Sequence, residues 1–357
     1  MIRSSGPIAL APPYFFEIAR IGVLAAPNIC TSGACAGLVS GSPVIVFTYG
    51  TDLTLPPYHG GAKAVNLAGS VLWTYTSAQN SYGMLCAAGD VAGDGVTKFI
   101  VTFQSPDHTV ALLSGAGAEL WTYSFPAAYA RGPKIGKLTA AAGNQILVGG
   151  ASGHVVLLDK DGNLIWDSPL GGPTVQDVAI GDLDGSGSNG IVVIHDCAVK
   201  RLNPATGTVL WSTTLDAASQ WCMDVAIGQV TGAAGKQIIA ARTGQYTQPQ
   251  VICLGPSGNI LWSQNMTYPV WGVGCYDIDG DGYDEVFANC GTQGWESPGT
   301  PFPAEVVMLG KTGNTLCRRA LAADGCTVNF FDVDGDGYAE VLMGGNDCAV
   351  HIVRARK

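Results

Sequence analysis

A strand-turn-strand hairpin, with glycine in its turn and an anchor residue in its second strand, recurs six times along the chain. The anchors are Trp73, Trp121, Trp166, Trp211, Trp262 and, with the tryptophan replaced, Cys317. They follow one another at a mean spacing of about 49 residues. Repeats of roughly 40 to 50 residues that each hold four short strands are typical of β-propeller blades. The repeat therefore predicts an all-β propeller of four-stranded antiparallel blades.

Seven copies of the unit can be traced, and we expect them to form a single domain over residues 1–357. The expected blades are residues 15–75, 82–124, 132–170, 174–215, 221–265, 271–321 and 325–357. The last copy stops after its third strand, so another segment must supply its outer strand. We expect residues 1–14, which include the apolar segment 7–11, to add this strand and close the ring. Closure protects sheet edges that would otherwise pair with other chains.

Two near copies of one acidic loop lie in the C-terminal third of the chain. Each has aspartate at positions 1, 3 and 5, glycine at position 6 and glutamate at position 9. These carboxylates, with the carbonyl of position 7, supply the oxygen ligands that Ca²⁺ prefers, and the glycine permits a sharp turn. The two predicted calcium sites comprise Asp277, Asp279, Asp281, Tyr283 and Glu285 in one loop, and Asp332, Asp334, Asp336, Tyr338 and Glu340 in the other. An apolar run follows each loop, so we expect it to lead into a strand and not into the helix of an EF-hand.

Two upstream copies of the loop are degenerate. A third, weaker calcium site is predicted at Asp182, Asp184 and Ser186. In the copy that begins at Asp90, position 9 is Lys98. We expect its ammonium group to replace the ion by pairing with Asp90 and Asp94.

With these loops, the chain resembles the FG-GAP or VCBS repeat family, the calcium-bearing β-propellers of integrin α-subunit heads and of many bacterial surface proteins. The matching segments are the two full loops, the degenerate copies at 89–94 and 181–185, and glycine-rich strand ends such as 148–151. The resemblance covers the chain from about residue 82 to its C-terminus. It implies adhesion or lectin-like binding, and in some members a lyase activity, because one fold serves several functions.

The composition favours an extracellular or cell-surface protein. Only 13% of the residues are charged, and the net charge is −10. A nucleic-acid partner requires clustered Lys and Arg, which this chain lacks, so none is expected. No apolar run approaches the roughly 18 residues that span a membrane. Residues 1–30 do not form a convincing signal peptide, and we expect that an export signal was removed before this numbering begins.

Eleven cysteines are many for a reducing compartment, and they favour disulfides. The predicted pairs are Cys30 with Cys35, Cys197 with Cys222, and Cys290 with Cys326, with Cys326 to Cys348 as an alternative. The second and third pairs stand in the same relation to consecutive blades, which indicates bridges between neighbours. Cys86, Cys253 and Cys317 are interpreted as buried small hydrophobic residues.

We expect ligands to bind on the face opposite the acidic loops, where the long insertions lie. These insertions are residues 51–61, 104–108, 244–250 and 291–304. Exposed aromatic rings suit stacking on sugars or anchoring a protein partner. The predicted ligand contacts on this face are Trp295, Tyr246 and Tyr268. Trp221 and Trp271 are instead expected to pack between blades.

The predicted function is a binding or adhesion module for a glycan or an extracellular protein, without enzymatic activity. One alternative is a structural subunit that self-assembles into a surface layer or filament. Another is a rhamnogalacturonan-type polysaccharide lyase. Its candidate catalytic residues are His108, Arg131, Lys134, His154 and His195. The segment 202–211 is also similar to the tryptophan-docking repeat of pyrroloquinoline quinone dehydrogenases, but the chain lacks their Cys-Cys dipeptide, so that cofactor is not expected.

Overall fold

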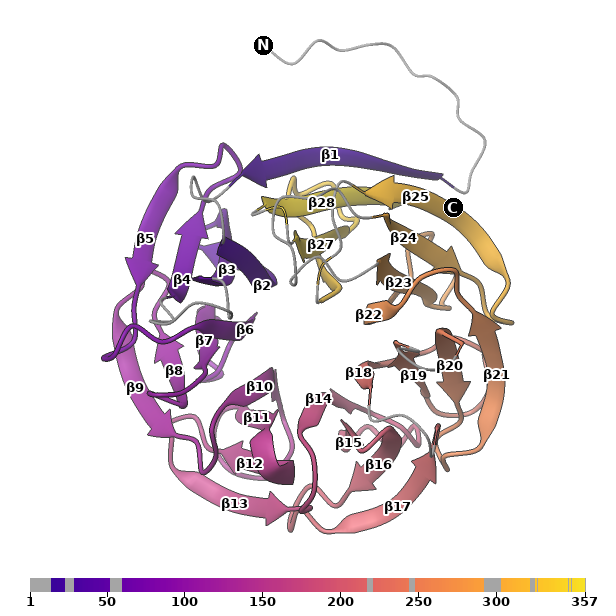
Figure 1. The fold of residues 1–357 in the computed structure, drawn as a ribbon, viewed down its shortest axis with the longest axis horizontal. Coiled ribbons are helices and arrows are strands. Elements are labelled where there is room, and N and C mark those ends of the chain that lie inside the picture. Colours follow the sequence, from indigo (N-terminus) through magenta and orange to yellow (C-terminus); the bar gives the residue numbers. More distant parts are fainter. Residues whose placement is uncertain are drawn as a thin grey trace.

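The chain forms seven four-stranded antiparallel sheets arranged around a central axis (Figure 1), which confirms the predicted seven-bladed propeller. The structure is a computed structural model. It describes residues 14–22, 29–51, 60–216, 221–243, 248–291, 303–321, 325, 327–345, 347 and 349–356. Within this part of the chain, no helix is long and apolar enough to cross a membrane.

The blades follow one another in sequence order, each running from the central axis to the rim (Figure 1). Blade 1 consists of β2 (Ile29–Val39), β3 (Ser42–Thr51), β4 (Gly60–Val65) and β5 (Val71–Tyr75). Blade 2 consists of β6 (Gly83–Gly89), β7 (Lys98–Phe103), β8 (Thr109–Leu113) and β9 (Glu119–Ser124). Blade 3 consists of β10 (Ala130–Gly136), β11 (Gln145–Gly150), β12 (His154–Leu158) and β13 (Leu164–Pro169), with the short 3₁₀ helix η1 (Ala151–Gly153) before β12. Blade 4 consists of β14 (Val175–Gly181), β15 (Gly190–His195), β16 (Ala198–Leu202) and β17 (Val209–Thr214). Blade 5 consists of β18 (Cys222–Gly228), β19 (Gln237–Arg242), β20 (Gln250–Leu254) and β21 (Ile260–Asn265). Blade 6 consists of β22 (Val270–Tyr276), β23 (Glu285–Gly291), β24 (Ala304–Leu309) and β25 (Thr315–Leu321). Blade 7 is β26 (Asn329–Phe331), β27 (Glu340–Gly345), β28 (Ala349–Arg356) and the N-terminal β1 (Tyr14–Gly22).

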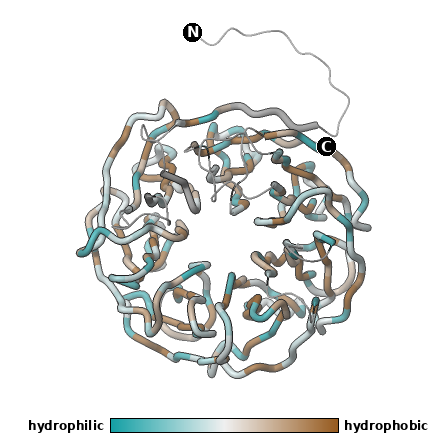
Figure 2. Tube along the Cα trace, viewed as in Figure 1, coloured by the Kyte–Doolittle hydropathy of each residue, from teal (hydrophilic) through white to brown (hydrophobic). Residues whose placement is uncertain are grey.

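The hydrophobic core is divided into seven clusters, one at each boundary between neighbouring blades. Hydrophobic stretches accordingly recur in every blade around the ring (Figure 2). The second strand of a blade is covered on both faces by its neighbours, so every residue of β11, β15 and β27 is buried. The outer strands β9, β17 and β21 instead alternate exposed and half-buried residues. Stability therefore depends on each blade having a neighbour on both sides.

Four of the repeated tryptophans, at positions 73, 121, 166 and 262, donate a hydrogen bond to the next blade. The indole Nε1 of Trp73 donates to the Gly115 carbonyl at 3.0 Å, and that of Trp121 donates to the Lys160 carbonyl at 3.1 Å. Both acceptors lie in the outer turn of the following blade. Gly162 in the same turn as Lys160 has a φ of +83°, and a Cβ added there would lie 2.7 Å from the Trp121 ring. Gly162 of blade 3 therefore packs directly against the Trp121 ring of blade 2.

The N-terminal strand closes the ring, but it is not the segment that the sequence indicated. β1 pairs antiparallel with β28, from Tyr14 opposite Arg356 to Gly22 opposite Ala349. It lies along the rim of blade 7 (Figure 1). The prediction that blade 1 begins near residue 15 is wrong, because this segment completes blade 7 and blade 1 begins with β2. Residues 7–11 lie outside the described residues.

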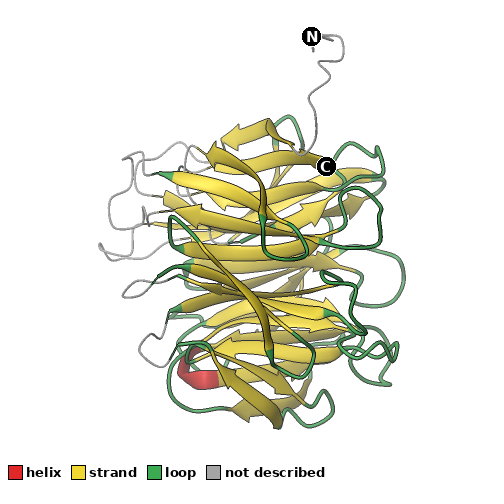
Figure 3. Ribbon diagram, turned by 90° about the vertical axis from the view of Figure 1, so that its right-hand side faces the viewer, coloured by secondary structure: helices red, strands yellow, loops and turns green. Residues whose placement is uncertain are grey.

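The two faces of the disc are formed by different kinds of connection (Figure 3). Because the strands are antiparallel, the loop from the first to the second strand and the turn from the third to the fourth strand reach the same face. We call it the acidic-loop face. The loops from the second to the third strand and the connections between blades reach the opposite, connection face. The first strands of all seven blades line the channel between the two faces.

Candidate functional site

The acidic loop of blade 6 is folded around its first aspartate. Asp277 follows β22 directly, and its carboxylate accepts from the backbone N–H groups of Gly280, Asp281 and Gly282 at 2.8, 3.2 and 2.8 Å. Carboxylate oxygens of Asp277, Asp279 and Glu285 lie within 4.8 Å of one another. Glu285 is buried at the start of β23, where its Oε2 accepts from the Ile278 N–H at 3.3 Å. The loop thus gathers three oxygen ligands within coordinating reach of one point.

The acidic loop of blade 7 has the same backbone pattern but also contains a cation from the protein. Carboxylate oxygens of Asp332, Asp334 and Asp336 lie within 4.8 Å of one another. The guanidinium of Arg354 on β28 donates to Glu340 Oε1 at 2.8 Å and also pairs with Asp334. Its distance to Asp336 is 3.9 Å. A guanidinium of the protein therefore lies among the carboxylates of the blade 7 loop.

In the degenerate loops, side-chain donors take up the oxygens that a metal ion would bind. In blade 2, Lys98 Nζ bonds both carboxylate oxygens of Asp94 at 3.1 Å and the position 7 carbonyl of Val96 at 3.4 Å. In blade 3, Lys137 Nζ bonds the position 7 carbonyl of Gly143 at 3.0 Å. The prediction for Lys98 is right for Asp94 but wrong for Asp90, because the Asp90 carboxylate accepts backbone N–H groups instead.

The weaker site predicted in blade 4 also has a cation beside it. Arg201 donates to Asp184 Oδ2 at 3.2 Å. Hydrogen bonds from Ser186, followed by the one from Arg201, lower the pKa of Asp184 to about 2. The backbone N–H of Ser186 binds both Asp182 and Asp184, at 3.1 and 3.2 Å. This loop is therefore partly neutralised by the protein itself.

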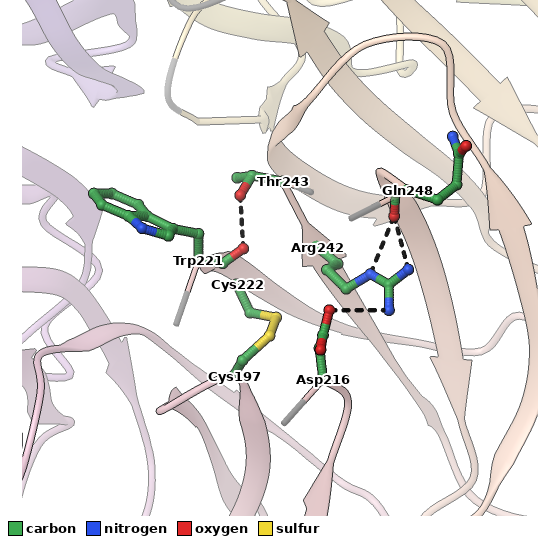
Figure 4. The surroundings of a disulfide bond; sticks show 7 residues. All are labelled: Cys197, Asp216, Trp221, Cys222, Arg242, Thr243 and Gln248. Carbon is green, nitrogen blue, oxygen red and sulfur yellow. Dashed lines mark hydrogen bonds and ion pairs between the residues drawn. A yellow bond between two sulfur atoms is a disulfide. The ribbon is translucent and has the colours of Figure 1, made fainter. Parts of the chain in front are cut away.

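A disulfide joins blade 4 to blade 5 on the connection face (Figure 4). It links Cys197, in the turn between β15 and β16, to Cys222 at the start of β18, as predicted. Beside it, Arg242 pairs with Asp216 at 3.5 Å and donates to the Gln248 carbonyl at 2.7 Å. These contacts fix the boundary between the two blades on the connection face.

Two cysteines that we expected in disulfides, Cys35 and Cys290, are free. Cys35 is a free, buried thiol. Cys30 and Cys35 both lie on β2, five residues apart. An extended strand rises about 3.3 Å per residue, so the two positions are too far apart for a disulfide. Cys290 is also free, and burial raises its pKa. Cys326 and Cys348 lie outside the described residues.

Of the cysteines interpreted as small hydrophobic residues, Cys86 and Cys253 are buried, as expected, whereas Cys317 is half-buried. Burial raises the pKa of Cys253 to about 12. A thiol with such a pKa stays protonated and behaves as an apolar side chain.

The predicted ligand contacts are only partly placed. Trp295 and Tyr246 lie outside the described residues, and Tyr268 is half-buried against the core between blades 5 and 6. Trp271 is half-buried and donates to the Gly291 carbonyl at 2.9 Å. The exposed large apolar side chains of the described chain lie at the other end of the blades, on or near the acidic-loop face. They include Val71, Leu72, Leu120, Leu164, Ile165, Val209, Leu210, Ile260 and Leu261.

The candidate lyase residues do not converge. His108 bonds the Phe125 carbonyl at 2.7 Å, His154 bonds Asp167 at 2.9 Å, and His195 bonds the Gly171 carbonyl at 2.8 Å. Each histidine thus has its own partner, in blade 2, 3 or 4. Arg131 and Lys134 lie elsewhere, in the central channel.

The central channel holds a charged cluster that sequence reasoning missed. It encloses a cavity of about 360 Å³. On its wall, Lys134 Nζ lies 3.1 Å from Asp177 Oδ1, and Asp224 of the next blade accepts from the Val273 N–H at 2.9 Å. Burial, then the charge of Asp177 and a hydrogen bond to it, raise the pKa of Asp224 well above its usual value. Burial lowers the pKa of Lys134, but the charges of Asp177 and Asp224 outweigh it, and the pKa is raised.

A sequence signal for these two aspartates exists. Residues 177–181 and 224–228 are both Asp-Val-Ala-Ile-Gly. The repeat places an aspartate at the same β-bulge of two consecutive inner strands. Side chains at this position meet around the channel, which no spacing along one blade reveals.

Comparison with known proteins supports the propeller and leaves the family open. The model of the outer membrane protein assembly factor BamB matches residues 59–187 and 106–220, less than half of the chain. These matches include the hairpins of Trp73, Trp121, Trp166 and Trp211. The matched family is not the FG-GAP or VCBS family, which therefore stays a resemblance. A comparison with curated protein sequences finds no match.

Solved structures show the same fold at low identity. A crystal structure of BBS1N in complex with ARL6DN, soaked with mercury, has a TM-score of 0.66 and 11% identity over 97% of this chain and 98% of that chain. The same complex soaked with lead has a TM-score of 0.67 and 12% identity over 96% and 97%. At this identity the likeness establishes architecture alone.

Proposed function

We propose that the protein is an extracellular β-propeller, stabilised by calcium, that serves as a binding module for a glycan or a protein. The observation that carries the calcium proposal is the convergence of Asp277, Asp279 and Glu285 in the blade 6 loop. All three ligand atoms are carboxylate oxygens, the ligand type that suits a hard cation. Backbone N–H groups already hold Asp277 in place, so little reorganisation is needed for coordination.

The other blades support a ligand role for the position 7 carbonyl. The carbonyls of Val96 and Gly143 accept from lysine ammonium groups inside their own loops. In blade 5, the carbonyl of Gly235 accepts from the Gln237 amide at 2.9 Å. By analogy, Tyr283 and Tyr338 supply carbonyl oxygens to calcium in blades 6 and 7, which brings each shell closer to the six to eight oxygens that Ca²⁺ takes.

The three candidate calcium sites differ in the competition they face. In blade 7 the ion must displace the Arg354 guanidinium from Asp334 and Glu340, or share these carboxylates with it. In blade 4, Arg201 opposes an ion at Asp184 in the same way. We therefore expect Arg354 and Arg201 to weaken calcium binding at the blade 7 and blade 4 loops.

Calcium in this position has a structural role, because the loop joins the first two strands of a blade. The binding role falls to the connection face, where loops extend from a rigid scaffold. A propeller of this fold, BBS1N, is in complex with a protein, ARL6DN. That complex is a precedent for a protein partner, whereas aromatic residues in the long insertions, Trp295 and Tyr246, suit either a protein or a sugar.

The Cys197–Cys222 disulfide supports the extracellular setting. Disulfides persist in oxidising compartments and are rare in the cytosol, where thiols are kept reduced. The bridge joins blades 4 and 5, whose boundary on this face is also held by the Arg242–Asp216 ion pair and by side-chain packing. A cross-linked, calcium-bound ring suits a protein that works outside the cell.

Calorimetric titration with calcium tests the first part of the proposal. The parent protein should bind calcium, and chelation should lower its Tm, because an ion that binds only the folded state stabilises it. Asp279→Ala should weaken binding at the blade 6 loop. Asp161→Ala is the matched control, since Asp161 is an exposed aspartate in a turn of the same face that only pairs with Lys160. Equal calcium affinity in both variants, or an unchanged Tm in excess chelator, would contradict calcium stabilisation.

A glycan array and native sizing test the binding role. Trp295→Ala and Tyr246→Ala should weaken binding by roughly thirtyfold, since losing an aromatic anchor costs about 2 kcal/mol. Their melting curves should match that of the parent. If both variants bind like the parent, the interaction surface lies elsewhere, and large ordered assemblies would indicate a structural subunit instead.

A further inference from the structure

Two free thiols lie close together where blade 1 packs against blade 2. Cys35 belongs to β2, the first strand of blade 1, and Cys86 belongs to β6, the first strand of blade 2. Both are free and buried, and both belong to the hydrophobic cluster between these two blades. A disulfide between them would therefore join two blades that are consecutive around the ring.

The two inner strands approach each other closely at this point. A Cβ added to Gly33 on β2 would lie 3.4 Å from the Leu85 Cα and 3.6 Å from the backbone nitrogen of Cys86, both on β6. Cys35 lies two residues after Gly33 in a regular stretch of the strand, so its side chain leaves the same face of β2. The Cβ atoms of a disulfide are about 3.5–4.5 Å apart, a separation that strands this close can provide.

The Cys86 sulfur lies beside Cys35. Its Sγ donates to the Val46 carbonyl at 3.5 Å, and Val46 is the residue of β3 directly opposite Cys35. Burial, and then a hydrogen bond with the Cys86 thiol, raise the pKa of Cys35 well above its usual value. The two thiols are thus neighbours across a blade boundary, in a chain whose Cys197–Cys222 disulfide already joins two other blades.

We propose that Cys35 and Cys86 form a second disulfide between blades when the chain folds under oxidising conditions. One cysteine thiolate displaces a thiolate from a small-molecule disulfide such as oxidised glutathione, and the other cysteine thiolate then displaces the small molecule from the mixed disulfide. The two cysteines are oxidised, and the reagent is reduced to two thiols that take up the two protons. Because both cysteines are buried in the finished ring, we expect the exchange to occur during folding, before blade 2 packs on blade 1.

The proposed bond closes a longer loop of chain than the bond already present. Cys35 and Cys86 are 51 positions apart, against 25 for Cys197 and Cys222. A cross-link restricts the unfolded chain, and the restriction grows with the length of the loop. The loop contains β3, β4 and β5, so the bond ties the whole of blade 1 to blade 2. Blade 1 is also the neighbour of blade 7, where the N-terminal strand closes the ring.

Peptide mapping of the refolded protein tests the proposal. The reduced, denatured chain is refolded with oxidised glutathione, its remaining thiols are alkylated in denaturant, and it is cut with trypsin without reduction. Cleavage after Lys and Arg places Cys86 in the peptide 64–98, and Cys35 together with Cys30 in the peptide 21–63. The parent should yield these two peptides joined by a disulfide. The peptides 161–200 and 202–236, which hold Cys197 and Cys222, should be joined in the same way.

Three variants identify the sulfur atoms that are joined. Cys35→Ala should abolish the link between the peptides 21–63 and 64–98 and leave Cys86 alkylated, whereas Cys30→Ala should keep the link. Cys317→Ala is the matched control, because it removes a free, half-buried thiol of blade 6 and should leave the map unchanged. The proposal is overturned if Cys86 of the refolded parent is alkylated, or if the link survives Cys35→Ala and is lost in Cys30→Ala.

A melting experiment measures what the proposed bond contributes. In a chain with both Cys197 and Cys222 replaced by alanine, the bond already present cannot form. Refolding this chain with oxidised glutathione should give a Tm roughly 5 °C above that of the same chain refolded with reductant. Adding Cys35→Ala to this chain should remove the difference. A difference in Tm that persists in the added variant would contradict the assignment of the bond to Cys35.

Discussion

The guanidinium of Arg20 lies 2.6 Å from the carboxylate of Asp347, although the two residues are 327 positions apart in the sequence. Arg20 belongs to β1, and Asp347 lies in the turn between β27 and β28. The pair thus joins the first described strand of the chain to its last blade. His351 completes the group, with its Nε2 3.0 Å from the other oxygen of Asp347.

We expect acid to weaken the closure of the ring at this group. Burial raises the pKa of Asp347, but His351 and Arg20 outweigh it and lower the pKa to about 2. A carboxylate with a depressed pKa stabilises the fold above its unfolded pKa, here 3.8, and this stability is lost as the pH falls toward 2. Asp347→Asn should remove this part of the acid dependence, measured as Tm against pH.

The size of the Asp347 effect should be modest. Arg20 is about half exposed, so its pairing contributes at most about 1 kcal/mol. Asp161→Asn, which alters an exposed pair in a turn, serves as the control. If Asp347→Asn and the control have the same Tm profile between neutral and acid pH, the pair does not take part in closure.

Arg354→Gln should change the calcium affinity of the blade 7 loop. Without the guanidinium, Glu340 and Asp334 lose their internal cation, so the calcium-free protein should melt at a lower temperature. Calcium should then bind this loop roughly tenfold more tightly, which corresponds to about 1.4 kcal/mol. Calorimetry with Arg318→Gln as the control, a variant that breaks an ion pair to Glu305, measures the difference. An unchanged affinity would mean that Arg354 does not compete with the ion.

Gly162→Ala should destabilise the boundary between blades 2 and 3. The added Cβ would lie 2.7 Å from the Trp121 ring, at a φ of +83° that favours glycine. We expect a loss of about 2–4 kcal/mol from the combined clash and backbone strain. Gly187→Ala, at a φ of +81° with no atom within 4 Å of the added Cβ, should cost only the strain, about 1 kcal/mol. Chemical denaturation measures both values, and equal losses would show that the contact with Trp121 contributes nothing.

Asp224→Asn should make the protein more stable in mildly alkaline buffer. A carboxyl with a raised pKa contributes stability that is present below its unfolded value, 3.8, and is lost as the pH rises through its folded value. The asparagine keeps an acceptor for the Val273 N–H and a donor toward Asp177, while Lys134 retains its pairing with Asp177. The variant should match the parent at about pH 4 and melt higher as the pH rises. A difference in Tm that is constant with pH would contradict the assigned proton.

The blade architecture was predictable because it rests on local and periodic signals. The Trp and Gly of each hairpin lie at fixed positions in their own repeat, so one pattern marks six of the seven blades, with Cys317 in place of Trp in blade 6. The first strand of the ring carries no such signal. Residues 7–11 and the segment Tyr14–Gly22 are both apolar enough to form a strand, and only pairing with β28 distinguishes them.

The cysteines show the same division between local and non-local information. Cys197 and Cys222 recur at blade boundaries, and that relation led to the right pair. Cys30 and Cys35 are near in sequence but lie on one extended strand, which holds residues five positions apart too far from each other for a disulfide.

The sequence by itself determined the seven-fold repeat, the strand order within each blade and the positions of the acidic loops, because each depends on residues within about 50 positions of one another. Tertiary structure alone decided that Arg354 enters the blade 7 loop and that Lys134 of blade 3 pairs with Asp177 of blade 4 on the channel wall. Both facts depend on which strands become neighbours when the ring closes. A charge is compensated by whatever lies within a few ångströms of it, and in a closed ring those neighbours come from other blades or from the far end of the chain.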